Sequence, residues 1–196
     1  GLFPLILRPG NQGPHSGQIS LPGGKREANE SLEETALRET EEEIGLNATE
    51  IQVLGSLTPL YIPVSGFAVY PYVGWYSRSP EFKRDPLEVD EILFYDMLRL
   101  SHPDYRTVYD FSYNGRQFQS PGFRLDNRII WGATAVTAAS QYACWMLAAV
   151  RRRLFDCMAG SAGSTGQQSA EKYWLLYHDR ICSSKLYHRQ ILNVYI

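Results

Sequence analysis

The segment Gly23–Leu46, GGKREANESLEETALRETEEEIGL, constrains the fold more than any other part of the chain. Apolar side chains recur in it at helical spacing. Ser31 and Glu34 have the spacing of a capping box, and Gly45 is placed to end a helix. The segment therefore predicts a helix over Ser31–Ile44. Like charges crowded on one helix repel each other, so its glutamates need either water or a cation.

A helical wheel separates these glutamates into two groups. At about 100° per residue, Glu39, Glu42 and Glu43 fall within an arc of about 100° beside the apolar stripe. Glu34 and Glu41 point toward water. Carboxylates that converge near a buried side repel each other at a cost that divalent cations would remove. Mg²⁺ prefers oxygen ligands and is usually completed by the phosphates of a substrate.

The spacing of the glycines, glutamates and arginine in this segment resembles the Nudix box, G-x5-E-x7-R-E-U-x-E-E-x-G-U, in which U is a bulky apolar residue. Every fixed position matches, and Thr40 stands where the first bulky apolar residue is usual. The resemblance implies an α/β fold, the Nudix-type α/β/α sandwich with a mixed sheet. It also implies hydrolysis of a nucleoside diphosphate linked to another group. The fixed positions are Gly24, Glu30, Arg38, Glu39, Glu42, Glu43 and Gly45.

The resemblance also implies roles for these residues. The cation is expected to be Mg²⁺ or Mn²⁺, because hard oxygen ligands suit both. Arg38 is expected to assist catalysis and to hold Glu30 through a bidentate pair. The expected metal ligands are Glu39, Glu42 and Glu43, with Glu42 also a catalytic candidate, and the expected supporting residues are Gly24, Glu30 and Gly45.

Hydrolysis also requires a group that accepts the proton of the attacking water. This base is expected to be a glutamate of the box or a carboxylate from a later loop. The best later segment is PLEVDE at residues 86–91, and Glu88 is its catalytic candidate. The alternative interpretation of Glu88 is a surface carboxylate that precedes a strand.

A second signature precedes the box and narrows the substrate. The run HSGQISLPGG at residues 15–24 resembles the coenzyme A pyrophosphatase branch of the Nudix family, in which an apolar strand ending in Arg precedes G-x3-[FL]-P-G-G. Pro63–Phe67 and Ile130–Ala135 also resemble that branch. The branch commonly has a second Arg, which Pro9–Pro14 lacks. The expected substrate contacts are Arg8, His15, Gln18 and Ser65.

The implied reaction converts coenzyme A, or acyl-CoA, to 3′,5′-ADP and 4′-phosphopantetheine. One alternative is a broader Nudix pyrophosphatase that acts on ADP-ribose or dinucleoside polyphosphates. Another is a Nudix-like binding module without catalysis, but such modules typically lose box glutamates that this chain keeps. The coenzyme A reaction and the broader pyrophosphatase reaction both take a small-molecule nucleotide as substrate.

Outside the box, short apolar runs predict strands, and Asn114-Gly115 predicts a hairpin turn. A long helix is expected to begin at Arg128. This order favours a mixed α/β fold over a parallel doubly wound sheet. The expected strands are Leu2–Arg8, Ile19–Leu21, Ile51–Leu60, Phe67–Tyr76, Val89–Phe94, Tyr109–Ser112 and Arg116–Gln119, with a helical turn over Tyr95–Leu100.

The end of the chain differs in composition from the rest. Residues 1–140 are net acidic, whereas residues 141–196 are net basic and hold all three cysteines. Ala159–Ser169 is rich in Gly and Ser, as flexible linkers are. We therefore expect a Nudix hydrolase domain over residues 1–140. We expect an atypical extension over residues 141–196, partly disordered or not native.

Charge and cysteine content exclude some classes of partner. A formal net charge of −2 gives no broad electrostatic reason to expect nucleic acid or an anionic membrane. Ile129–Val150 has the length of a membrane span, but its polar side chains favour a buried helix, so no membrane is expected. Three widely spaced cysteines suit neither a zinc site nor a disulfide framework, and free thiols favour the cytoplasm. The oligomeric state stays open.

Overall fold

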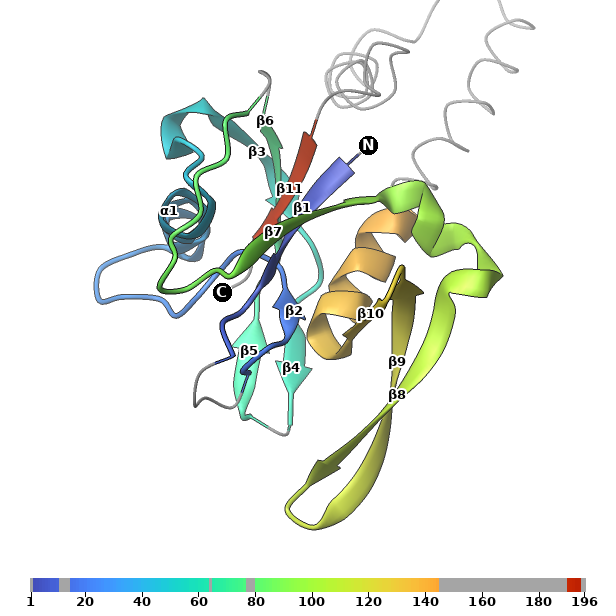
Figure 1. The fold of residues 1–196 in the computed structure, drawn as a ribbon. Coiled ribbons are helices and arrows are strands. Elements are labelled where there is room, and N and C mark those ends of the chain that lie inside the picture. Colours follow the sequence, from blue (N-terminus) through green and yellow to red (C-terminus); the bar gives the residue numbers. More distant parts are fainter. Residues whose placement is uncertain (1, 11–14, 64, 77–79, 145–189, 195–196) are drawn as a thin grey trace, which may run out of the picture.

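The computed structural model describes residues 2–10, 15–63, 65–76, 80–144 and 190–194. Most of the described elements are strands, and the helix of the box, α1, covers 13 residues (Figure 1). The elements are β1 (Leu2–Leu7), β2 (Ile19–Ser20), α1 (Leu32–Ile44), β3 (Ile51–Ser56), β4 (Leu60–Ile62), β5 (Phe67–Val69), β6 (Tyr72–Tyr76), β7 (Glu91–Asp96), β8 (Arg106–Tyr113), β9 (Arg116–Leu125), β10 (Arg128–Trp131), a helix over residues 132–144 and β11 (Gln190–Val194), with short 3-10 turns at Ala48–Glu50, Met97–Ser101 and Pro103–Tyr105.

A mixed six-stranded sheet is built around β1. β7 pairs antiparallel with β1 along its whole length, from Leu2 opposite Asp96 to Leu7 opposite Glu91. β1 also pairs antiparallel with β2 and parallel with β11. β6 joins β11 to β3 through antiparallel pairs. The prediction of a mixed sheet rather than a parallel doubly wound one is therefore confirmed.

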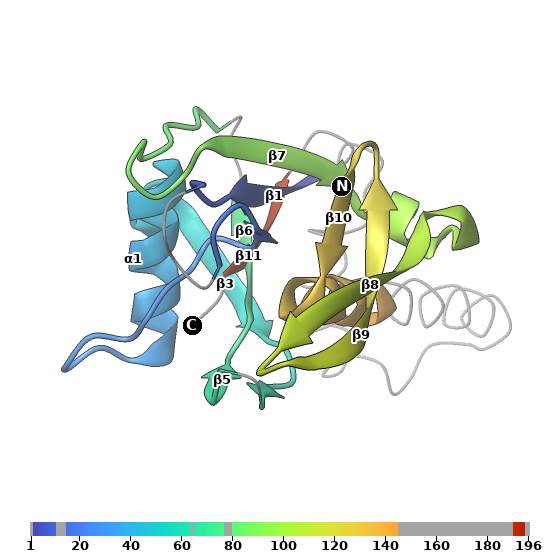
Figure 2. The ribbon, with the colours of Figure 1, turned by 60° about the horizontal axis from the view of Figure 1, so that its bottom comes forward.

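The two helices lie on opposite sides of this sheet, as Figures 1 and 2 both show. Successive side chains of a strand point to opposite faces, so β1 contributes to two apolar clusters. Phe3 and Leu5 pack in one cluster with alanines of the helix over residues 132–144. Ile6 packs in the other with Ile44 of α1 and Val89. The sequence-based expectation of a fold that mixes helices and strands is confirmed.

Two expected strands are each divided in the structure. The expected strand Ile51–Leu60 becomes β3 and β4, with Pro59 between them, and Phe67–Tyr76 becomes β5 and β6, with Pro71 between them. Proline has no N–H to donate to a neighbouring strand, so it interrupts the ladder. β4 and β5 form a hairpin of their own instead of extending the main sheet.

The expected start of the long helix at Arg128 is wrong. Residues 128–131 form β10, which pairs antiparallel with β9, and the helix begins at residue 132. The absence of a side chain at Gly122 allows this pairing, because a Cβ there would lie 2.6 Å from the carbonyl oxygen of Ile130. The helix then docks on β2, where the Thr134 hydroxyl donates to the carbonyl of Ile19 at 3.3 Å.

Little of the expected C-terminal extension falls within the described residues. Residues 141–144 continue the helix, and Gln190–Val194 form β11 between β1 and β6. The expected linker Ala159–Ser169 lies outside the described residues, as does the end of Ile129–Val150. The boundary at residue 140 stays a prediction. Among the described helices, none combines the length and hydrophobicity needed to cross a membrane.

Candidate metal centre

The helix α1 has the capped ends that its sequence predicts. The Ser31 hydroxyl accepts the N–H of Glu34 at 3.2 Å, and the Glu34 carboxylate accepts the N–H of Ser31 at 2.7 Å. At the other end, Gly45 adopts a left-handed conformation with φ of 75°. A Cβ at Gly45 would lie 2.7 Å from the carbonyl oxygen of Lys83, so glycine is required for both reasons. These caps fix where α1 begins and ends, and its buried Ala36 and Ile44 turn Glu39 and Glu43 toward the interior.

Glu43 is buried at the end of α1, with a side chain only 1% exposed. One carboxylate oxygen accepts the backbone N–H of Gly23 at 2.7 Å, and the other lies 3.4 Å from the Arg8 guanidinium. Burial disfavours the charged form and raises the pKa of Glu43 to about 8, although Arg8 and the Gly23 N–H oppose the shift. A bound cation would therefore strongly stabilise the ionised form of this buried carboxylate.

Glu39 lies one turn before Glu43 on the same side of α1 and is also buried. The Arg38 guanidinium donates to its carboxylate at 2.9 Å. Burial raises the pKa of Glu39, against the lowering effect of Arg38. The backbone of Gly24 lies so close that an added Cβ would collide with the carboxylate of Glu39. The expected supporting position Gly24 therefore has a steric reason to be glycine.

Gly24→Ala is expected to displace Glu39 and to lower the affinity for Mn²⁺ by about tenfold, as removal of supporting contacts around a metal ligand commonly does. Titration of Mn²⁺ in the absence of substrate, followed by electron paramagnetic resonance, measures this change. Gly10→Ala is the matched control, because no atom lies within 4 Å of a Cβ built there. Equal Mn²⁺ affinity in both variants would refute the steric role of Gly24.

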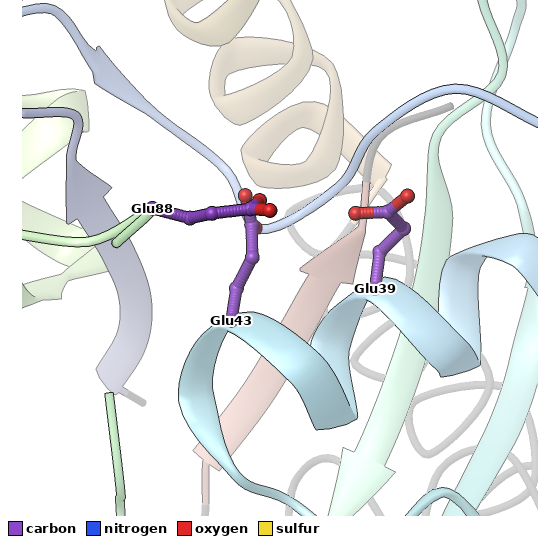
Figure 3. Close-up of side chains that lie close together, drawn as sticks. All are labelled: Glu39, Glu43 and Glu88. Atoms are coloured by element: carbon purple, nitrogen blue, oxygen red, sulfur yellow. The ribbon is translucent and has the colours of Figure 1, made fainter. Parts of the chain in front are cut away.

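Glu88 joins the two helical glutamates from the loop that precedes β7. Oxygen atoms of Glu39, Glu43 and Glu88 all lie within 4.8 Å of one another. Figure 3 shows the carboxylates of Glu43 and Glu88 close together, with that of Glu39 turned toward the same space. Glu88 is exposed, whereas the other two are buried, so the cluster opens to solvent on the side of the loop. The sequence alone had left Glu88 open between this site and an ordinary surface position.

These three carboxylates fit a hard divalent cation. All of the donors are oxygens, which Mg²⁺ and Mn²⁺ accept. Oxygens within 4.8 Å of one another would need only small side-chain adjustments to hold one such cation together. Burial of two carboxylates without a full complement of positive charge also favours a cation.

Arg38 is the centre of a second carboxylate group. It holds Glu30 through two hydrogen bonds, of 2.6 and 3.2 Å, which confirms the predicted bidentate pair. Mainly because of this pairing, the pKa of Glu30 falls to about 2. The same guanidinium donates to Glu39 and, at 2.7 Å, to Glu42. Arg38 therefore links the start of the helix to a buried metal-ligand candidate.

Glu42 does not converge with Glu39 and Glu43 as the helical wheel predicted. Its side chain is 58% exposed, and its carboxylate is held by Arg38, one turn earlier on the helix. Among the described residues, Glu88 rather than Glu42 completes the group of three oxygens. The assignment of Glu42 as a metal ligand stays a prediction.

The four expected substrate contacts lie in different surroundings. Arg8 contacts the metal-ligand candidate Glu43 and donates to the carbonyl of Gly23 at 2.9 Å. His15 and Gln18 contact each other at 3.2 Å on an exposed turn. Ser65 is exposed between β4 and β5, where its N–H donates to Ile62 at 3.3 Å. Their roles toward a substrate stay predictions.

Two features of the centre were not predicted from the sequence. One is the backbone N–H of Gly23, which binds Glu43, and the other is the attachment of Arg8 to Glu43. Adjacent glycines at positions 23 and 24 were a signal of close backbone approach, but the sequence does not say which side chain approaches.

Comparisons with known proteins agree with this site. Residues 5–106 match the NUDIX domain, a span that contains α1, Glu88 and β7. A relative named "Uncharacterized Nudix hydrolase NudL" in Yersinia enterocolitica is 36% identical over 148 residues, which cover 68% of this chain and 74% of the relative. Proteins of the same name in Yersinia pestis and Yersinia pseudotuberculosis are each 35% identical over 148 residues and are covered to 72%.

The matched region includes the helix, its caps and all three clustered carboxylates. Both the domain match, which covers just over half of the chain, and the relatives support the same family. The chain therefore belongs to the Nudix hydrolase family and is a pyrophosphohydrolase.

Proposed function

We propose that the chain hydrolyses the diphosphate linkage of coenzyme A or acyl-CoA, with Mg²⁺ or Mn²⁺ held by Glu39 and Glu43. The observation that carries the reaction class is the group of three carboxylates within 4.8 Å of one another, of which Glu39 and Glu43 belong to the Nudix box and Glu88 to the loop before β7. The signature before the box, an apolar strand ending in Arg8 followed by GQISLPGG, supports the choice of coenzyme A.

The products follow from the bonds that change. One P–O bond forms from water and one P–O bond of the diphosphate breaks, which releases 3′,5′-ADP and 4′-phosphopantetheine. Divalent cations, when bound, supply neutralisation of the diphosphate charge and activation of water. Arg38 orients Glu39 and holds Glu42 nearby as a further ligand.

In this proposal Glu88 accepts the proton of the attacking water. Its carboxylate is exposed, so water and substrate reach it, and it lies beside the buried Glu39 and Glu43, which hold the cation in this proposal. A general base must lie within hydrogen-bond reach of the water that it deprotonates. The proximity of Glu88 to both buried carboxylates supports this role over a surface role.

Binding of the substrate falls to the elements upstream of the box and to the β4–β5 hairpin. His15 and Gln18, which contact each other on an exposed turn, offer polar groups to a phosphate, as does Ser65 on the hairpin. Arg8 is part-exposed, with 31% of its side chain accessible, so it can contact a phosphate while it remains near Glu43.

Incubation of the protein with coenzyme A and Mg²⁺ tests the proposal. We expect both 3′,5′-ADP and 4′-phosphopantetheine by mass spectrometry, and loss of both products when a chelator removes the metal. Parallel incubation with ADP-ribose at the same concentration is the control for substrate choice. If ADP-ribose is cut and coenzyme A survives, the broader Nudix pyrophosphatase is the correct assignment.

A further inference from the structure

Glu88 lies on a loop, so its position depends on what holds that loop. We define the clasp as residues 82–90, the segment that directly precedes β7. Two backbone hydrogen bonds attach it to the C-terminal end of α1: the N–H of Lys83 donates to Ile44 at 3.0 Å, and the N–H of Asp85 donates to Glu43 at 3.1 Å. The clasp is therefore attached to the backbone of the very residue whose carboxylate Glu88 approaches.

Apolar contacts anchor both ends of the clasp. Val89 is 0% exposed and packs with Ile6 and Ile44, and Phe82 packs against the same cluster. The ring of Phe82 lies 4.8 Å from that of Phe94 in β7. Between these anchors the clasp projects into solvent, where the Leu87 side chain is 80% exposed. Side-chain packing therefore holds Val89 but not the exposed Leu87 and Glu88 that precede it.

Two charged side chains brace this exposed part. The carboxylate of Asp85 accepts the N–H of Leu87 at 2.8 Å, while its backbone carbonyl accepts the N–H of Val89 at 2.8 Å. The guanidinium of Arg84 donates to the carbonyl of Val89 at 2.7 Å. Arg84 thus joins the two ends of the turn, and Asp85 closes it from within.

We propose that Arg84 and Asp85 are positioning residues that hold Glu88 at the cation site. This inference rests on the proposed function, because it assigns Glu88 a role at that site. Without these hydrogen bonds the exposed turn would have more backbone freedom, so Glu88 would spend less time beside Glu43. The hydrogen bonds of Arg84 and Asp85 restrict this backbone freedom before a cation binds.

A double-mutant cycle with Glu88→Gln separates positioning from a general effect on folding. Mn²⁺ affinity without substrate and turnover with coenzyme A are measured for each variant. Glu88→Gln is expected to lower Mn²⁺ affinity about tenfold and Arg84→Met about fivefold. Because Arg84 acts through Glu88, the double variant is expected to match Glu88→Gln alone. Losses that multiply in the double variant would overturn the inference.

Lys83→Met is the matched control. It removes the neighbouring positive charge but keeps the backbone N–H through which residue 83 is attached to α1. It is expected to change Mn²⁺ affinity by less than about twofold, whereas Arg84→Lys, which keeps a charged N–H donor for the single bond to Val89, is expected to recover most of the loss. Amide hydrogen exchange at Leu87 and Val89 in chelator is expected to speed up in Arg84→Met. Unchanged exchange and affinity in that variant would refute the brace.

Three further outcomes are distinguishable. If Arg84→Met does not fold, Asp85→Ala, which removes the acceptor for Leu87, supplies the same cycle from the other brace. If the wild-type protein cuts neither coenzyme A nor ADP-ribose but the cycle holds for Mn²⁺ affinity, the proposed function fails and the positioning inference stands. If Glu88→Gln changes neither Mn²⁺ affinity nor turnover, the inference fails while the reaction class survives.

Discussion

Glu43→Gln is expected to reduce turnover by about 10²–10³-fold while the fold is kept. Glutamine has nearly the same shape, so it still fills a site that is 1% exposed and still accepts the N–H of Gly23. It removes the negative charge that a divalent cation requires and replaces one acceptor oxygen with an amide group. Turnover at saturating Mg²⁺ and substrate, together with circular dichroism, measures both parts of this prediction.

Glu41→Gln is the matched control on the same helix. Glu41 is exposed and points away from the cluster, so its replacement is expected to leave turnover within about twofold of wild type. Full activity of the Glu43→Gln variant would refute the ligand assignment. Equal losses in both variants would indicate a general effect of charge on the helix rather than loss of a ligand.

The parts of the site that were predictable are those set by local sequence. The capping box of Ser31 and Glu34 and the left-handed Gly45 involve residues within a few positions of each other, and all three are present. The pair of Arg38 and Glu30 spans only the N-cap and the first turns of the helix, and it also forms as predicted. The four-residue spacing of Glu39 and Glu43 places both on one face, whatever the rest of the fold does.

Glu42 shows where a helical wheel stops being informative. The wheel gives the direction in which a side chain leaves the helix, but a glutamate side chain is long enough to follow its best partner. Arg38 lies four residues earlier and binds Glu42 at 2.7 Å, so the carboxylate stays at the surface. The third oxygen of the cluster comes instead from Glu88, through a loop whose path depends on contacts with α1 and β7.

The segment after Arg128 shows a different limit. A short apolar run such as Ile129–Trp131 has no periodicity that separates a strand from a buried helix. Its pairing partner, β9, decides the matter, because Gly122 leaves room for the backbone of β10. The choice therefore rests on a tertiary contact that a single segment does not encode. The prolines between β3 and β4 and between β5 and β6 were readable signals that the strand predictions passed over.

Without metal, the stability of the chain is expected to fall as pH rises from about 4.5 to about 8. Burial raises the pKa of Glu43 from 4.5 to about 8 in the folded chain. Below the lower value the carboxyl is protonated in both states, and between the two values only the unfolded chain ionises. The free energy of unfolding therefore decreases by up to about 1.4 kcal/mol per pH unit and levels off above the folded pKa. Urea unfolding in chelator across this range measures the slope.

Saturating Mg²⁺ is expected to reverse this trend, because the cation binds the ionised carboxylates of Glu39 and Glu43 in the folded chain only. Glu43→Gln is the control for both conditions, since its amide does not titrate. Its stability in chelator is expected to vary less with pH than that of wild type, and Mg²⁺ is expected to stabilise it less. A wild-type stability in chelator that rises between about pH 5 and about pH 8 would contradict the buried, cation-dependent state of Glu43.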